Sequence, residues 1–134
     1  MIELRNSVAQ TIQPGQAVTF DTLVFKSGNC ECWRKGIGSV RIRPGAVYEI
    51  DFNGNISGTA AGTPVQLAIA LGGQALPETV MVSTPGAAND FNNVGAGTFV
   101  RDCCCDADCV TVINTGTVPV LLSANMNLRI KRLG

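Results

Sequence analysis

Six cysteines are the residues of this 134-residue chain whose type and spacing point most directly to chemistry. Three are consecutive and a fourth follows shortly after, in the stretch Arg-Asp-Cys-Cys-Cys-Asp-Ala-Asp-Cys, while the other two form an early Cys-Glu-Cys motif. Thiols arranged in this way would form disulfides, hold a metal ion or act as a redox centre. The six are Cys30, Cys32, Cys103, Cys104, Cys105 and Cys109.

The geometry of an extended strand indicates which thiols would meet. Residues two apart on a strand share a face, so the two early cysteines point the same way, and so do Cys103 and Cys105. Four thiols would converge if the two segments lie side by side. Cys104 faces the opposite way and would meet Cys109 across an Asp-Ala-Asp turn. The sequence leaves the connectivity open, because six cysteines allow many pairings.

We favour disulfides, because the cysteine count is even and a bridge between the distant segments contributes about 4 kcal/mol in the loop-entropy description. The alternative is a structural zinc ion held by Cys30, Cys32, Cys103 and Cys105, although zinc knuckles usually have Cys-x2-Cys spacing. A redox or catalytic thiol is disfavoured, since the neighbouring aspartates would raise the pKa of a thiol. Those aspartates also lack the spacing of a calcium-binding loop.

Composition excludes several classes of function. The chain has no histidine, which removes serine–histidine and cysteine–histidine catalysis and the usual general base at neutral pH. Ten acidic side chains balance ten basic ones, so no overall field draws the chain to nucleic acid or to an anionic membrane. The N-terminal residues lack the pattern of a secretory signal. We therefore expect no enzyme, and no nucleic acid or membrane as a partner.

A second candidate site is the segment Trp33-Arg34-Lys35, which forms a basic cluster together with Arg41 and Arg43. The indole ring is suited to stacking on a sugar, and the cations are suited to a phosphate or a neighbouring protein. The alternative is a solvated outward strand face beside a turn, and we favour this alternative.

Apolar and polar residues alternate along much of the chain, which predicts strands instead of helices. The strands are short and separated by turn signals, among them Gly72-Gly73, as in an all-β sandwich or barrel. The inward-facing residues are expected to include Val40 and Ile42. The clearest alternating stretches are residues 48–52, 65–71 and 120–131.

We expect one domain over residues 1–134, with residues 1–6 as a very short N-terminal arm. The segments 54–64 and 83–97 are rich in small and polar residues, which predicts loops at one end of the sandwich.

Some outward strand positions carry small apolar residues, namely Ala68, Ala70, Val80 and Val82. The outer sheet of a monomer normally carries more charged side chains. Burial of this face against another copy and ordinary single exposed residues are both open interpretations.

Four stretches and the cysteine motifs carry a resemblance to a known family. The stretches are AVYEIDF at 46–52, VQLAIALGG at 65–73, VTVINTG at 110–116 and LRIKRL at 128–133. They resemble the tumour-necrosis-factor-like jelly roll of complement-type globular heads, exosporium proteins and surface proteins of Firmicutes and phages. Short Firmicutes and phage members are similar in a further respect, because they carry cysteine motifs like Asn29–Cys32 and Cys103–Asp106.

The resemblance implies an antiparallel jelly-roll sandwich that forms a compact homotrimer and serves adhesion, receptor binding or virion decoration. From it we predict a structural or binding protein on the virion surface, decorating the capsid or forming part of a head or tail fibre. Its partners would be itself and the capsid or fibre proteins. The alternatives are a carbohydrate-binding adhesin that contacts a cell-surface glycan, and a domain of a bacterial spore or cell surface. No cofactor is expected unless the cysteines hold zinc.

The disulfide hypothesis has a direct chemical test. Cysteines in disulfides do not react with an alkylating reagent, so we expect the denatured, unreduced chain to gain no adduct, and to gain six after reduction. The measurement is the mass of the intact chain. Free thiols with zinc retained in the native protein would favour the zinc alternative, and reactive thiols without metal would contradict both.

Overall fold

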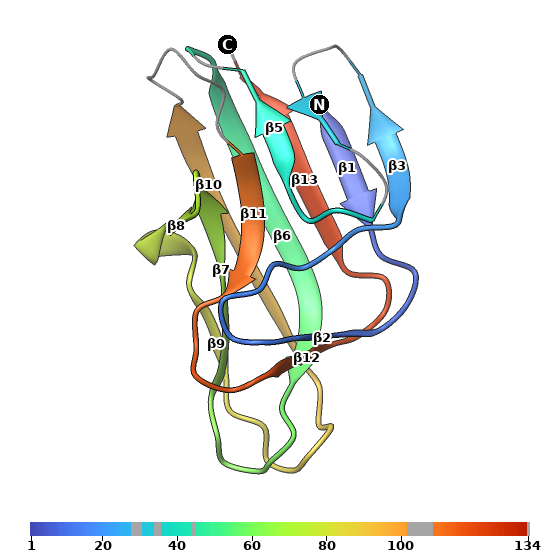
Figure 1. Cartoon of the computed structure of the whole chain (residues 1–134), viewed down its shortest axis with the longest axis vertical. Coiled ribbons are helices and arrows are strands. Elements are labelled where there is room, and N and C mark those ends of the chain that lie inside the picture. The colour runs from blue at the N-terminus through green and yellow to red at the C-terminus, as the bar shows by residue number, and fades with distance from the viewer. Residues whose placement is uncertain (28–30, 34–35, 44, 102–108, 134) are drawn as a thin grey trace.

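Two antiparallel β-sheets pack face to face in the computed structural model of the chain (Figure 1). The structure describes residues 1–27, 31–33, 36–43, 45–101 and 109–133. Apart from the short 3-10 helix η1 (Pro77–Thr79), the regular elements in these ranges are strands, and none of the helical structure there is long and apolar enough to cross a membrane. The predicted all-β antiparallel sandwich is therefore confirmed.

The larger sheet has seven strands, with β6 at its centre. Strand β10 pairs with β6 over the length of β10, while β12 and β13 also pair with β6. The strand order is β2 (Gln10–Ile12), β12 (Val120–Leu122), β6 (Val47–Ser57), β13 (Asn127–Arg132), β1 (Ile2–Arg5) and β3 (Thr22–Lys26), with β10 (Asn92–Arg101) attached to β6.

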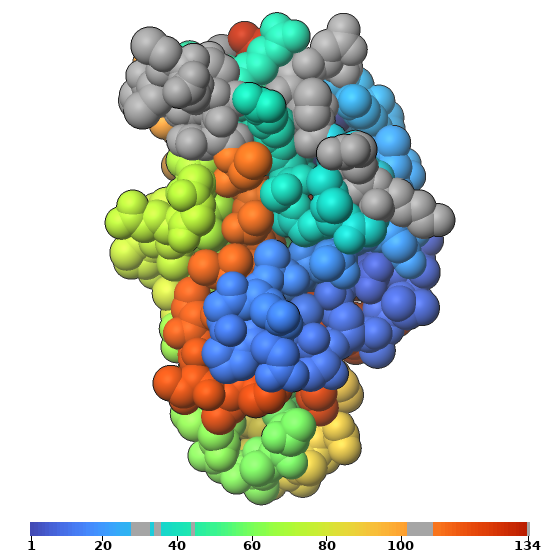
Figure 2. Space-filling view, viewed as in Figure 1, coloured from blue at the N-terminus to red at the C-terminus, as the bar shows by residue number. Residues whose placement is uncertain are grey.

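The smaller sheet has six strands and covers the inner side of the larger one. Residues 15–18 also join this sheet, because the Gly15 and Val18 amides donate to carbonyls of β11 (Cys109–Asn114) at 2.9 and 2.7 Å. Figure 2 shows this segment in blue beside β11 in orange. The order is β4 (Glu31–Cys32), β5 (Val40–Ile42), β11 (Cys109–Asn114), β7 (Val65–Leu71) and β8 (Gln74–Ala75), with β9 (Met81–Ser83) paired to β7.

The core lies between the sheets and is built by the alternation seen in the sequence. Tyr48, Ile50 and Phe52 of β6 are fully buried, as are the predicted inward residues Val40 and Ile42. Burying each such side chain contributes about 1.5–3 kcal/mol. The hydrophobic effect therefore fixes which side of each strand faces inward.

The two-residue hairpin predicted at Gly72-Gly73 is confirmed. These residues join β7 to β8, where Leu71 pairs with Gln74. Their φ angles of 61° and 83° are strained for most residues but accessible to glycine, as a type I′ turn requires.

The loop predictions over 54–64 and 83–97 are only partly right. Strand β6 continues to Ser57 and β10 begins at Asn92, so the loops are residues 58–64 and 84–91, at one end of the sandwich (Figure 1). The glycines that suggested a loop serve close packing instead. A Cβ at Gly54 would lie 3.1 Å from both Leu122 and Met126.

The expected N-terminal arm is instead part of the larger sheet. Strand β1 lies between β13 and β3, and its alternate residues Ile2 and Leu4 are buried. The N-terminal ammonium of Met1 donates to the Ser27 carbonyl at 2.8 Å. The arm prediction was wrong because a short alternating segment buries enough apolar surface to complete a sheet.

Deletion of a core ring should measure the contribution of the β6 alternation. Phe52→Ala removes a fully buried ring, and we expect the free energy of unfolding to fall by about 3–5 kcal/mol. The measurement is chemical denaturation, with Phe25→Ala as a control, because that ring is half exposed and its removal should cost about 1 kcal/mol. Equal losses in the two variants would contradict the placement of the core.

Candidate functional site

The outward side of the larger sheet, here called the outer face, carries the most distinctive surface chemistry. Alternation directs its polar side chains away from the core. The strand register aligns Glu3 of β1, Arg129 of β13, Asp51 of β6 and Gly97 of β10 in one row. Opposite charges therefore alternate across the sheet.

A second row runs beside the first, with Lys131 of β13, Glu49 of β6 and Phe99 of β10. Opposite charges directly across a strand pair contribute roughly 0.2–1 kcal/mol. The rows also leave the outer face with no strong excess of either sign, which disfavours a highly charged ligand here.

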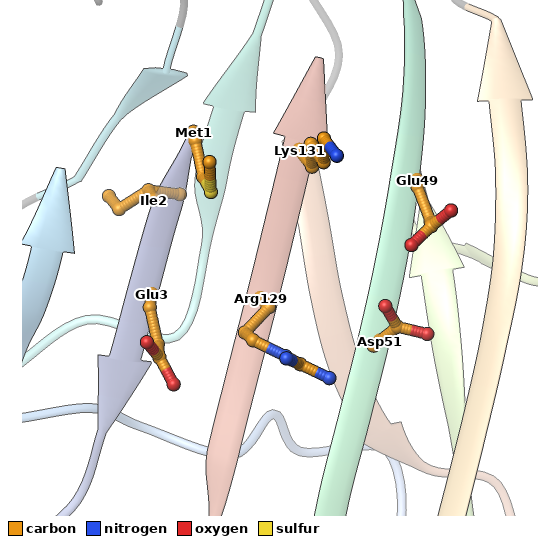
Figure 3. Close-up of a pocket in the computed structure, with 7 residues that line it drawn as sticks. All are labelled: Met1, Ile2, Glu3, Glu49, Asp51, Arg129 and Lys131. Carbon is orange, nitrogen blue, oxygen red and sulfur yellow. The ribbon is translucent and has the colours of Figure 1, made fainter. Parts of the chain in front are cut away.

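A hollow of about 280 Å³ lies over these rows. In Figure 3, the side chain of Arg129 extends from β13 toward Asp51, and Glu3 lies on the opposite side of it. Neither Arg129 nor Lys131 forms an ion pair with a described carboxylate, whereas Glu3 accepts a hydrogen bond from the Asn127 amide. The hollow is lined by Met1, Ile2, Glu3, Glu49, Asp51, Arg129 and Lys131.

Phe99 projects beside this hollow and is 66% exposed. A shallower depression next to it is lined by Glu49, Asp51, Gly97, Thr98 and Phe99. Gly97 leaves room for the Asp51 carboxylate there, because a Cβ would overlap Asp51 Oδ1 and the carboxylate would have to move. The Thr98 hydroxyl lies 3.3 Å from Glu78 Oε2 and links β10 to η1. The outer face thus combines a projecting aromatic ring with a neighbouring hollow.

The outer face offers binding surface, and it lacks a cluster of convergent ligands. Within the ranges that the structure describes, no group of three or more His, Cys, Asp or Glu side chains is placed to hold a metal ion. Alternating, solvent-accessible charges are suited to contact with another protein surface.

The two described cysteines, Cys32 and Cys109, lie at one end of the smaller sheet on opposite sides of β5. Cys32 of β4 pairs with Arg41 of β5, and Cys109 of β11 pairs with the same arginine from the other side. Two strand spacings separate these two cysteines, about 10 Å, which is too far for a direct disulfide.

The predicted sets of disulfide partners and zinc ligands lie mainly outside the described residues. Cys30 and Cys103, Cys104 and Cys105 belong to these undescribed positions. Cys109 is described as a half-buried free cysteine. The disulfide hypothesis and its zinc alternative therefore stay predictions.

Trp33 has a structural role that accounts for its side chain. Its indole N–H donates to the Ile37 carbonyl at 3.1 Å, and its ring packs against the core. Arg34 and Lys35 lie outside the described residues, so the predicted ligand contact of this segment stays untested. The half-buried ring offers little surface for stacking, and because it packs against the core it does not belong to a solvated outward strand face either.

Of the small apolar positions, Ala68 and Ala70 are fully buried within the chain itself, so no second copy is needed to cover them. Val80 and Val82 remain exposed.

Sequence reasoning missed Phe99, whose outward position follows from buried Val100 beside it. The sequence did not predict strand β10, so it gave no indication of which side of the sheet Phe99 would face.

The sequence matches no protein-family model and no curated protein. Solved structures match nearly the whole chain. Eiger TNF from S. frugiperda is 10% identical, with 99% of this chain and 91% of that chain covered and a TM-score of 0.72. The globular domain of zebrafish complement 1qA protein is 12% identical, with 98% and 94% covered and a TM-score of 0.69. Murine APRIL is 12% identical, with 97% and 96% covered and a TM-score of 0.62.

These identities are low, and the similarity lies in the fold. The two-sheet antiparallel arrangement and the near-complete coverage of both chains agree with the resemblance seen in the sequence. The chain has the jelly-roll fold of tumour necrosis factor and of complement globular heads.

Proposed function

We propose that this chain is a structural and binding component of a phage particle, which decorates the capsid or forms part of a head or tail fibre on the virion surface. We further propose that it assembles there as a homotrimer through its outer face. The jelly-roll fold supports this role, because jelly rolls are a common architecture of virion proteins. The mechanism is passive binding and needs no chemical step.

The exposed ring of Phe99 carries the proposal. A phenylalanine that is 66% exposed leaves apolar surface in water, and burying such a ring against a partner contributes about 1.5–3 kcal/mol. Aromatic residues are enriched at protein interfaces for this reason. Gly97, two residues before Phe99 on the same strand face, has no side chain, so a neighbouring molecule can approach the aromatic ring closely.

The position of the Phe99 side chain relative to the hollow favours a closed cyclic oligomer. Phe99 lies on β10, whereas the hollow extends over β6, β13 and β1. A contact between the ring of one copy and the hollow of the next joins two different surfaces. Such heterologous contacts generate closed rings when the rotation between copies permits closure, and the family resemblance favours three copies.

The charges of the outer face suit contact with a second copy. Glu49 and Asp51 form no ion pair with the described cations of their own chain, although they are only partly exposed. A neighbouring copy brings an identical alternating pattern, so opposite charges are able to meet across the interface. Complementary charges of this kind set register and specificity more than affinity.

Removal of the Phe99 ring tests the assembly. We expect light scattering to give the mass of a trimer for the wild type and of a monomer for Phe99→Ala, because each of three equivalent contacts loses about 2 kcal/mol of apolar burial. Phe91→Ala is the matched control, since it removes an exposed ring at the other end of β10 and should leave the trimer intact. A monomeric wild type would contradict the homotrimer.

The particle itself provides the test of location. Mass spectrometry of purified virions of the phage that encodes the chain should detect it in constant stoichiometry with the capsid or fibre proteins. Its absence from intact particles would contradict the structural role, whatever its oligomeric state.

A further inference from the structure

A second hollow lies at the end of the outer face where β2 and β12 approach the loop that leads into β10 (Figure 1). Its volume is about 290 Å³, close to the lower limit of about 300 Å³ for ligand pockets. None of the described residues that line it carries a charge. The lining residues are Ala9, Gln10, Thr11, Asn89, Phe91, Leu121 and Leu122.

The strand register builds the floor of this hollow. Leu121 of β12 pairs with Thr11 of β2 on one side and with Ser57 of β6 on the other. Phe91 directly precedes Asn92, which pairs with Ile56, so Phe91 extends the same row across β6. The row therefore places an aromatic ring and a leucine side chain on the outward side of the sheet, one on each side of Ser57.

Phe91 is 41% exposed, and it offers one flat apolar surface to the hollow. The neighbouring Ser57 is fully buried, and its hydroxyl has no hydrogen-bond partner in the described part of the chain. Phe91 and Leu121 make the floor mainly apolar, and the hydrogen-bonding groups that solvent can reach lie around it.

Asn89 supplies an unengaged amide at the rim. Its backbone has a φ of 62°, a left-handed conformation that asparagine tolerates better than most residues. Its backbone N–H donates to the Gly58 carbonyl at 3.1 Å, which fixes the turn. The side-chain amide makes no hydrogen bond with the residues that the structure describes.

Thr11 provides a second free group, because its exposed hydroxyl is also unengaged among the described residues. Gln10 differs, since its amide donates to the Thr19 carbonyl at 2.9 Å and accepts from the Thr19 amide at 3.0 Å. The hollow therefore presents one aromatic ring flanked by one free amide and one free hydroxyl.

We propose that this hollow binds a neutral pyranose ring of a cell-surface glycan. The C–H groups on one face of a pyranose pack against an aromatic ring, while its hydroxyl groups donate and accept hydrogen bonds, as an amide and a hydroxyl do. The absence of charge among the lining residues disfavours a phosphate or a metal cation. A single ring and two polar groups are suited to weak binding of one sugar, which several copies in an assembly would strengthen through avidity.

The sugar site goes beyond the proposed structural role and is spatially separate from the proposed trimer contact. Phe99 lies on β10 and Phe91 directly precedes that strand, eight residues away, a separation of about 26 Å along an extended chain. A protein that trimerises without binding sugar would refute the sugar site and leave the structural role intact. A protein that binds sugar as a monomer would refute the trimer and leave the sugar site intact.

The experiment begins with a glycan array and continues with the methyl glycosides of the sugars that bind. Titration by NMR should shift the side-chain amide resonances of Asn89 on addition of sugar. Phe91→Ala should weaken binding about tenfold, which corresponds to roughly 1.4 kcal/mol, while Phe91→Trp should retain it. Phe99→Ala is the matched control and should bind each sugar with the intrinsic affinity of the wild type.

Two conservative variants test the polar groups without disturbing the fold. Asn89→Gly preserves the left-handed backbone and removes the amide, and Thr11→Val replaces the hydroxyl with a methyl group at similar volume. Each should weaken binding while the free energy of unfolding stays close to that of the wild type. The proposal is overturned if no glycan binds the wild type, or if Phe91→Ala and Asn89→Gly both bind as the wild type does.

Discussion

The pairing of β6 with β10 on one edge and with β13 on the other is the constraint on which the rest of the structure depends. Strand β6 has eleven residues, and its register with β10 is continuous from Val47 to Ile56. Because side chains alternate between the two faces, this one register fixes both the buried row and the outward row of β10. The positions of Phe99 and Phe91 on the outer face follow from it.

The same pairing explains why small residues are concentrated where they are. Gly54 packs beneath Leu122 and Met126, and Gly97 leaves room for the carboxylate of Asp51. A side chain at either position would separate strands or displace a neighbour, so the glycines that suggest flexibility in the sequence permit close contact in the fold. Gly97 leaves the outer face low beside Phe99, and a hollow lies over β1, β13 and β6, a shape that suits another protein surface.

The parts of the fold that could be predicted from the sequence are those determined by local pattern. Alternation in residues 48–52 and 65–71 indicates strands, and Gly72-Gly73 indicates a two-residue hairpin, because burial and turn geometry act over a few residues. Strand β10 was not predicted, because its glycines and asparagines have low β-propensity and the strand forms through its pairing with β6. Strand β1 was missed because four residues carry little local signal.

The outer-face site could not be predicted for a related reason. Glu3, Arg129 and Asp51 come from the two ends and the middle of the chain, and alternation does not reveal which strands pair. Trp33 was the more obvious aromatic candidate in sequence, yet its ring packs against the core. Exposure, which distinguishes Phe91 and Phe99 from Phe20 and Phe52, is a property of the assembled sheets.

Solvent access to Phe99 in the assembled protein tests the central claim, contact between copies through the outer face, most directly. Fluorine NMR of protein labelled at its five phenylalanines, with a soluble paramagnetic agent, reports each ring separately. Phe20 and Phe52 serve as buried references, and Phe91 serves as the exposed one. Our account predicts that the Phe99 resonance is protected like those of the core. Broadening of Phe99 equal to that of Phe91 would contradict it.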